Sequence, residues 1–366
     1  MRYNTSFFPF FSFKFQLLIL LLLTTVSCLR YPLSEFRYQE VHHYDMVKIG
    51  GTKQAILING KKADNPVLVF LHGGPGFPVL PFAPFTESMK KLEEQYTIVY
   101  WEQRGTGRSF STSITAESMN INQFVDDTHE VINYVRNLLN KDKVFLWGHS
   151  WGSNVGALYA SRYPENLHAY ISTGQSVNPF KNERLGYEFV LDKAKENNNR
   201  KALRQLARID TIPENYTISD ALTVRKWVYR YGGIVHKNNL ERPYVDFQEI
   251  ITILSSPLYP LQVRLNLLQN PYFSINKLWE DLKKTDLHKQ APKINVPVYF
   301  LVGRHDIIVS HVLAKEYFEV LKAPAGKELV WFEKSAHRPF HEEKEKFLEI
   351  MKGRILENAY KGITEH

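Results

Sequence analysis

The sequence predicts an α/β fold in which a mostly parallel sheet is covered by helices on both faces, with a helical cap inserted late in the sheet. Short, almost continuously apolar segments alternate with segments of helical periodicity between residues 67 and 173. The alternation stops near residue 176 and returns at residue 296. Strands that are apolar along their whole length are typical of a parallel sheet buried on both faces. The interruption therefore predicts a helical insertion.

Two early strands are expected before the alternation begins and four buried strands within it. Two further strands follow the insertion, and each is succeeded by a helical stretch. In the helical patterns, apolar residues recur every three to four positions. The predicted strands are 40–49, 54–58, 67–72, 96–101, 143–148, 169–173, 296–303 and 327–333, and the predicted helices include 85–95, 120–140, 151–163 and the amphipathic segment 342–362.

The chain is expected to divide into four parts. Residues 1–28 form a targeting segment, 29–176 the first part of the α/β core, 177–290 the helical cap, and 291–366 the second part of the core. The cap segment is polar, helix-prone and rich in Tyr, Trp and Pro. Open parallel sheets bind ligands at the carboxyl ends of their strands. We therefore expect the cap to cover that edge as a lid.

The N-terminal segment has the features of an export signal. It carries Arg2 and Lys14, no acidic residue, and an apolar run from Leu17 to Val26 broken by two threonines. A signal segment is favoured over an uncleaved membrane anchor, because the apolar run is short. Cys28, the one cysteine of the sequence, ends the segment either as a lipidated residue or as a residue near a cleavage site. The protein is thus expected to be secreted or in the cell envelope, and membrane attachment through this segment or Cys28 is left open as an alternative.

Composition excludes several other classes of protein. The net charge is +8, but basic and acidic residues are interspersed, which is typical of a solvated surface and not of a nucleic-acid binding stripe. A single cysteine forms no disulfide within the chain and no thiolate metal site. We expect neither a metal nor a cofactor, and no nucleic-acid partner.

The motif Gly148-His149-Ser150-Trp151-Gly152 lies between a predicted strand and a predicted helix. In that setting Gly-x-Ser-x-Gly forms a sharp turn that holds its serine in a strained conformation, clear of the sheet edge. The small residues allow the strand and helix to approach closely. The helix N-terminus beneath the serine favours developing negative charge. Ser150 is therefore the predicted nucleophile.

A serine nucleophile needs a histidine base and a carboxylate that orients it, in the chain order Ser, Asp or Glu, His. Asp306 follows the predicted strand 296–303, and His337 follows the strand 327–333. Both lie at the carboxyl ends of strands, the edge that also carries Ser150. Ser150, Asp306 and His337 are the predicted catalytic triad, although an aspartate after a strand also serves as a helix cap.

Other acidic and histidine residues compete for these roles. His305 neighbours Asp306, but its side chain is expected to point elsewhere. His341 lies at or inside the predicted final helix, so His337 is preferred as the base. Asp126 and Asp127 precede the nucleophile within a helix, and we expect them to serve structure.

The third requirement is a pair of N–H donors for the oxyanion. Trp151, the residue after the nucleophile, should supply one. The loop His72-Gly73-Gly74-Pro75-Gly76 follows a predicted strand and should supply the other, because its glycines let the backbone approach the substrate. Gly74 is the predicted second donor, and Gly73 is the alternative.

The motifs HGGPG (72–76), EQRGTGRS (102–109) and GHSWGS (148–153), with Asp306 and His337, together resemble the proline iminopeptidase branch of the α/β-hydrolase superfamily. The resemblance covers nearly the whole chain from about residue 40. It implies an α/β-hydrolase core with a helical cap. It also implies a serine peptidase that removes an N-terminal residue, typically proline, from a short peptide or amide without a cofactor.

The chain departs from the family pattern in ways that bear on its substrate. Glu102 replaces the usual aspartate, His149 replaces a glycine, and Phe77-Pro78 follow Gly76 in place of further glycines. A carboxylesterase or lactonase with the same triad, or a binding protein that retained the fold, remain alternatives. An aspartate-nucleophile hydrolase is excluded by Ser150.

Two further sets of charged residues have open roles. In the family, cap carboxylates hold the substrate amine; no motif assigns them here among Glu183, Glu188, Glu241 and Glu249. Arg104 and Arg108 are expected to tie the oxyanion loop to the core rather than to contact substrate.

Overall fold

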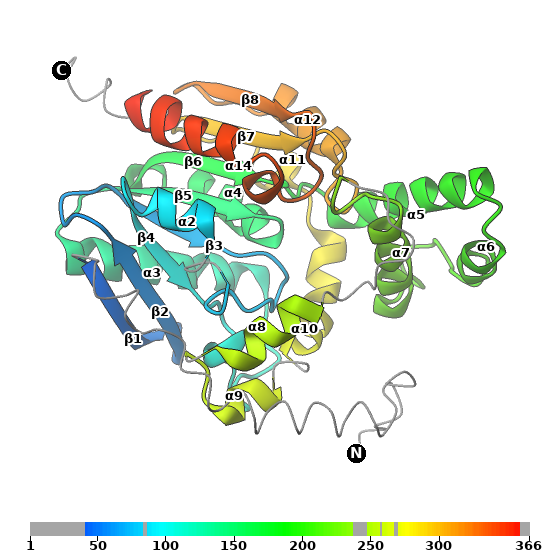
Figure 1. Ribbon diagram of the computed structural model, residues 1–366, viewed down its shortest axis with the longest axis horizontal. Coiled ribbons are helices and arrows are strands. Elements are labelled where there is room, and N and C mark those ends of the chain that lie inside the picture. Colours follow the sequence, from blue (N-terminus) through cyan, green and yellow to red (C-terminus); the bar gives the residue numbers. More distant parts are fainter. Residues whose placement is uncertain (1–40, 83–85, 237–246, 257, 267–269, 359–366) are drawn as a thin grey trace.

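The computed structural model describes residues 41–82, 86–236, 247–256, 258–266 and 270–358. Its centre is one eight-stranded sheet in the order β1-β2-β4-β3-β5-β6-β7-β8 (Figure 1). The hairpin β1-β2 is antiparallel and joins β4 in antiparallel register, while β4, β3, β5, β6, β7 and β8 run parallel. The mostly parallel sheet predicted from the sequence is confirmed.

All eight predicted strands are present within a few residues of their expected bounds. The central strands are buried along their whole length, which accounts for their continuously apolar sequences. The strands are β1 (Val41–Ile49), β2 (Thr52–Gly60), β3 (Val67–Leu71), β4 (Thr97–Trp101), β5 (Val144–His149), β6 (Leu167–Thr173), β7 (Val298–Gly303) and β8 (Lys327–Phe332).

Helices cover both faces of the sheet (Figure 1). Alternate residues of β2 point to opposite faces, with Ile56 and Ile58 in one core and Ala55 and Leu57 in the other. The first core is closed by α3 (Ile121–Leu139), α4 (Trp151–Arg162) and α12 (His311–Val320), and the second by α2 (Glu87–Leu92), α14 (Lys344–Glu349) and the π-helical segment Ile350–Ile355. Short 3-10 turns occur at Gly107–Ser109 and Pro164–Asn166.

The end of the chain differs from the single helix expected over 342–362. A short helix α13 (Pro339–Glu342) comes first, and the backbone leaves the helical region at Glu343, with φ −127° and ψ 56°. α14 and the π-helical segment follow. Phe347, Met351 and Ile355 are buried against the sheet. The amphipathic face was therefore predicted correctly, whereas the break at Glu343 was not.

Between β6 and β7 the chain forms the cap. Figure 1 shows α5, α6 and α7 grouped to one side of the sheet, with α8, α9 and α10 nearby. Helices α5 to α7 share a core of their own, which includes Val190, Leu206 and Trp227. The cap helices are α5 (Pro179–Glu196), α6 (Arg200–Leu206), α7 (Ile218–Arg230), α8 (Phe247–Ser255), α9 (Leu261–Asn266), α10 (Asn270–Lys284) and α11 (Leu287–Gln290).

The predicted targeting segment, residues 1–28 with Cys28, lies outside the described residues. In the described part of the chain, none of the helices combines the length and apolar character needed to cross a bilayer. Across the same residues, His, Cys, Asp and Glu side chains form no group of three or more with the arrangement of a metal site.

Candidate active site

Ser150 is the single residue between β5, which ends at His149, and α4, which begins at Trp151. Its backbone has φ 55° and ψ −122°, a conformation that L-residues rarely adopt and that stores strain. The flanking glycines are required by contact distances. A Cβ on Gly148 would lie 2.6 Å from the carbonyl oxygen of Gly152, and a Cβ on Gly152 would lie 2.1 Å from that of Leu71. The sequence folds here into the sharp strand–serine–helix turn that the motif predicts.

The other two predicted triad members are brought together at the same sheet edge. Asp306 follows β7 and His337 follows β8, and Asp306 Oδ2 lies 2.8 Å from His337 Nδ1. Asp306 Oδ1 accepts the backbone N–H of Val309 at 2.9 Å. One oxygen of Asp306 therefore holds the turn before α12 and the other contacts the imidazole, whereas the N-cap of α12 is Ser310.

Backbone packing holds this Asp–His pair in place from two sides. Gly174, with φ +57°, lies so close that an added Cβ would be 2.8 Å from His337 Cε1 and 3.3 Å from Asp306 Oδ2. From the cap, the carbonyl of Gly233 accepts the N–H of Ile307 at 3.0 Å. The carbonyl of Ile234 accepts the backbone N–H of His337 at 3.0 Å. The residues just after α7 thus bind directly to the loops that carry Asp306 and His337.

The electrostatics leave His337 neutral. Its pKa is lowered to about 3, first because the ring is buried and then because the Arg338 and Arg225 guanidinium groups repel a further positive charge. Burial raises the pKa of Asp306 well above its usual value, and the backbone N–H groups of Val309 and Ile308 only partly oppose this by favouring the charged form. A neutral imidazole held by a carboxylate can accept a proton from a serine hydroxyl at neutral pH.

The glycine loop after β3 lies against the nucleophile. A Cβ on Gly73 would be 3.2 Å from Ser150 Cβ, so this glycine permits the close approach. Gly74 has φ +127°, which favours glycine. Both line the same cavity as Ser150 and Trp151. The assignment of the oxyanion donors to Gly74 and Trp151, with Gly73 as the alternative, stays a prediction.

The loop after β3 is tied to the core by the segment that follows β4. Gln103 donates its backbone N–H to His72 Nε2 at 3.1 Å and its side-chain amide to the His72 carbonyl at 3.2 Å. Gln103 also accepts the indole N–H of Trp151 at 2.8 Å. Glu102 accepts the backbone N–H of Leu80 at 3.4 Å. The EQRG segment therefore positions the oxyanion loop through its first two residues.

The expected tie through Arg104 and Arg108 is corrected by the structure. Arg104 pairs with Asp127 of α3 through bonds of 3.0 and 2.9 Å, and both side chains are fully buried. Arg108 donates to the carbonyl of Leu258 at 2.7 Å and lies over the Tyr44 ring. The two arginine side chains therefore hold α3 and the segment between α8 and α9, and not the loop after β3. Asp127 serves structure, as expected.

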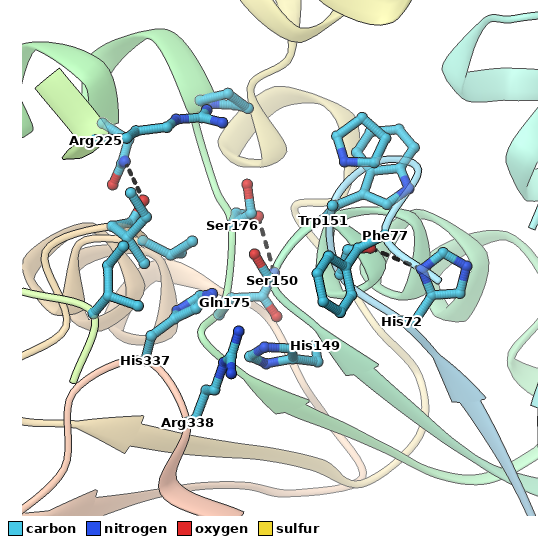
Figure 2. Close-up of a pocket in the computed structure, with 18 of the residues that line it drawn as sticks. His72, Phe77, His149, Ser150, Trp151, Gln175, Ser176, Arg225, His337 and Arg338 are labelled. Carbon is cyan, nitrogen blue, oxygen red and sulfur yellow. Dashed lines mark hydrogen bonds between the residues drawn. The ribbon is translucent and has the colours of Figure 1, made fainter. Parts of the chain in front are cut away.

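A cavity of about 490 Å³ opens above Ser150, a volume typical of sites for small molecules. Aromatic and aliphatic side chains form most of its wall, and Figure 2 shows Ser150 between His337 on one side and Trp151 and Phe77 on the other. The core contributes Phe70, Phe77, Val79, Phe82, Met89, His149 and Phe340, and the cap contributes Phe180, Glu183, Arg225, Trp279, Leu282 and Lys283.

The competing histidines and the cap carboxylates differ in whether they reach the cavity. His305 stacks on His236 at 3.8 Å, away from the triad. His341 lines the cavity, but it is His337 that Asp306 contacts. Glu183 also lines the cavity, whereas Glu188 is exposed. Glu241, and the side chain of Glu249 in α8, lie outside what the structure describes.

Several side chains in the cavity wall were not assigned roles from the sequence. The His149 ring lies 4.7 Å from the His337 ring and 4.9 Å from Phe340, and its Nδ1 is 3.1 Å from Thr173 Oγ1. Arg225 reaches the cavity from α7, and Arg338 directly follows His337. The position of His149 beside the nucleophile was a usable signal. Arg225 had none, because it lies far from the motifs along the chain.

The fold and this arrangement define an α/β hydrolase. A family model described as the alpha/beta hydrolase fold matches residues 66–344. A "Probable aminopeptidase YbaC" of Bacillus subtilis is 33% identical over 303 residues, which cover 81% of this chain and 91% of that protein. A "Proline iminopeptidase" of Saccharolobus solfataricus is 26% identical over 302 residues, which cover 80% and 85%.

The chain belongs to the proline iminopeptidase-like branch of the α/β-hydrolase family. A crystal structure of the proline iminopeptidase of Mycobacterium smegmatis has the same fold, with a TM-score of 0.59, 17% identity, and coverage of 87% of this chain and 99% of that one. The family resemblance inferred from the motifs is thereby confirmed.

Proposed function

We propose that this protein is a serine peptidase that removes an N-terminal residue, proline or a residue of similar size, from short peptides or aminoacyl amides. The observation that carries the proposal is the strained Ser150 turn facing the same cavity as His337, whose Nδ1 is held by Asp306 at 2.8 Å. The names of the relatives support peptide or amide substrates over other acyl compounds.

The proposed reaction runs through an acyl-enzyme. His337 accepts the proton of Ser150 as the serine oxygen attacks the substrate carbonyl, and backbone N–H groups of Gly74 and Trp151 stabilise the oxyanion. The imidazolium then gives that proton to the leaving nitrogen, and the C–N bond breaks. Water attacks the ester on Ser150 with His337 again as base. The hydrolysed acid leaves, and Ser150 regains its proton.

Glu183 is the candidate group for a substrate ammonium. Among the described residues that line the cavity, it is the one with a carboxylate. It lies in the second turn of α5, in the cap. A free-amine substrate would place its positive charge near this carboxylate, and an N-blocked substrate would lose the interaction.

A carboxylesterase or lactonase of the same fold is the second candidate, and the same glutamate favours it. Glu183 Oε1 accepts Arg225 Nε at 3.0 Å, and Oε2 accepts the hydroxyl of Tyr216 at 3.3 Å. These contacts already neutralise and occupy the carboxylate. A neutral acyl group would need no charged partner in the cap.

A matched substrate panel distinguishes the two candidates. Purified protein would be offered prolyl and alanyl amides, their N-acetylated forms and simple aryl esters, with Ser150→Ala as the blank. The peptidase proposal predicts cleavage of the free amides and a large loss on N-acetylation. Cleavage of esters and blocked substrates, with free amides untouched, would assign the protein to the esterases.

We also propose that the protein is exported and acts outside the cytoplasm, which rests on the residue pattern of 1–28 alone. Expression with and without these residues, followed by fractionation, tests it. Retention of the full chain in the soluble cytoplasmic fraction would contradict the proposal.

A further inference from the structure

We infer that Arg338 binds a carboxylate on the leaving group, so that the preferred substrates are dipeptides with a free C-terminus. The inference rests on the proposed function, since it concerns the amine released when Ser150 is acylated. It adds an anion subsite on the side of the cavity formed by the His337 loop.

The location of Arg338 is the first support. It directly follows His337 and precedes α13, and it lines the cavity together with Ser150 and His149. Figure 2 shows its side chain near those of His149 and His337. The residue is half-buried. Its backbone N–H donates to Glu342 Oε1 at 3.2 Å, which fixes the start of the arginine side chain beside the catalytic loop.

The Arg338 charge acts on the histidines that surround the nucleophile. In His337 and His341 the Arg338 charge is the second cause of a lowered pKa, after burial. In His149 it is the third cause, after burial and the neighbouring His337. Such effects require the guanidinium to lie near all three rings. An ammonium group at this place would be repelled, and an anion would be attracted.

The charges of the cavity wall agree with an anionic substrate group. Its described residues include three cationic side chains, Arg225, Lys283 and Arg338, and one carboxylate, Glu183. Arg225 is engaged by Glu183, and Lys283 lies 2.9 Å from Glu280. Arg338 is the cation of this wall that directly follows His337, the ring that transfers the proton.

The chemistry of peptide cleavage puts a carboxylate at that position. His337 must contact the leaving nitrogen to protonate it. When the leaving group is a single amino acid, its carboxylate carbon is two bonds from that nitrogen. The residue next to His337 therefore lies within reach of the carboxylate. A guanidinium has five N–H donors and binds a carboxylate with two of them. Arg338 can therefore bind the substrate carboxylate while its other donors keep their contacts within the protein.

Peptide length follows from the same geometry. Each additional residue in the leaving group moves the terminal carboxylate by up to about 3.3–3.6 Å along an extended chain. A tripeptide would therefore place a neutral peptide bond near Arg338. The preferred substrate class is a dipeptide, followed by longer peptides and neutral amides.

The experiment compares kcat/KM for prolyl-alanine and prolyl-alaninamide, which differ in the C-terminal charge. The wild-type full-length protein should favour the acid by about tenfold or more, the value of one charged hydrogen bond. In Arg338→Gln the ratio should fall to about one, and Arg338→Lys should restore part of it. The ratio is the readout because any change in the pKa of His337 affects both substrates.

Arg304→Gln is the matched control. Arg304 also follows a strand at this edge, but it pairs with Glu333 at 2.7 Å and stacks on Trp331 at 3.6 Å. Its substitution should leave the ratio unchanged. A wild-type ratio near one, or a ratio that Arg338→Gln does not alter, would overturn the inference while leaving the peptidase proposal intact.

If the protein is not a peptidase, neither prolyl peptide will be cleaved, and this result differs from equal cleavage of the two. If neither peptide is cleaved, the same comparison is made with an O-acyl lactate and its amide, whose leaving oxygen has a carboxylate two bonds away. A charge preference lost in Arg338→Gln would then keep the anion subsite in an esterase. Equal rates for the two esters would overturn it.

Discussion

The carboxylate of Glu102, at the end of β4, accepts a hydrogen bond from the hydroxyl of Tyr259, between α8 and α9. It also accepts the backbone N–H of Arg108 at 2.7 Å and that of Leu80 at 3.4 Å. One buried carboxylate thus connects the strand, the oxyanion loop and a cap segment. Its pKa is raised to about 7, because burial outweighs these hydrogen bonds.

This pKa predicts a pH-dependent stability. Between about pH 4.5 and 7 the folded protein binds the Glu102 proton more tightly than the unfolded chain does. The free energy of unfolding should therefore fall as pH rises through that window, by up to about 3 kcal/mol from this group. Glu102→Gln does not titrate, so its stability relative to wild type should increase from pH 5 to 8 in denaturant titrations.

Glu319→Gln provides the control, because Glu319 is exposed and pairs with Lys315 at the surface. It should track wild type at every pH. A constant stability difference between Glu102→Gln and wild type across the range would show that Glu102 does not titrate there.

Gly174→Ala should impair turnover without removing any catalytic group. The new Cβ would lie 2.8 Å from His337 Cε1 at a position where φ is +57°, so the imidazole must move. Misplacement of about 1 Å costs on the order of 100-fold in rate, and we expect a loss of that size in kcat. The control is Gly326→Ala, at φ +102° with no atom within 4 Å of the new Cβ. Equal kcat losses in both variants would mean that backbone strain alone is responsible.

Arg338→Gln should move the acid limb of kcat/KM to higher pH. The base must be neutral, and the Arg338 charge helps to lower the pKa of His337 to about 3. Without that charge His337 binds a proton more readily, so activity is lost at a higher pH as the solution is acidified. Arg304→Gln should leave the limb in place. A limb that stays put or moves to lower pH in Arg338→Gln would contradict this electrostatic account.

Asp127→Ala should destabilise the fold by about 3–5 kcal/mol, because it leaves Arg104 buried without its ion-pair partner. The activity of the molecules that remain folded should change little, since neither residue lines the cavity. Glu316→Gln removes an exposed partner of Lys181 and should cost at most about 1 kcal/mol. Denaturant unfolding of both variants measures the difference, and similar small losses would show that the buried pair contributes little.

The strands and the sharp turn at Ser150 were predictable because the residues that determine them lie close together in the sequence. The turn at Ser150 is encoded by residues within two positions, and buried parallel strands have continuously apolar sequences. The placement of Asp306 and His337 at the same sheet edge was predictable because topology brings the carboxyl ends of parallel strands together there.

Other parts depend on contacts between residues far apart in the chain. Arg104 meets Asp127, and Glu102 meets Tyr259, 157 residues later. No local pattern specifies either partner. Arg225 likewise reaches the cavity through the packing of α5 against α7, which the sequence of the cap does not reveal. The choice of Glu183 among the four candidate carboxylates, and the proposed carboxylate subsite at Arg338, therefore depend on the structure.

The most direct test of the central claim is active-site labelling with a fluorophosphonate, followed by peptide mapping. If Ser150 is the nucleophile, one adduct per chain should form, on Ser150. Its formation should be slowed by a prolyl dipeptide, and it should be absent in Ser150→Ala. An adduct at another residue, or labelling of Ser150→Ala at the wild-type rate, would contradict the assignment of Ser150 as the nucleophile.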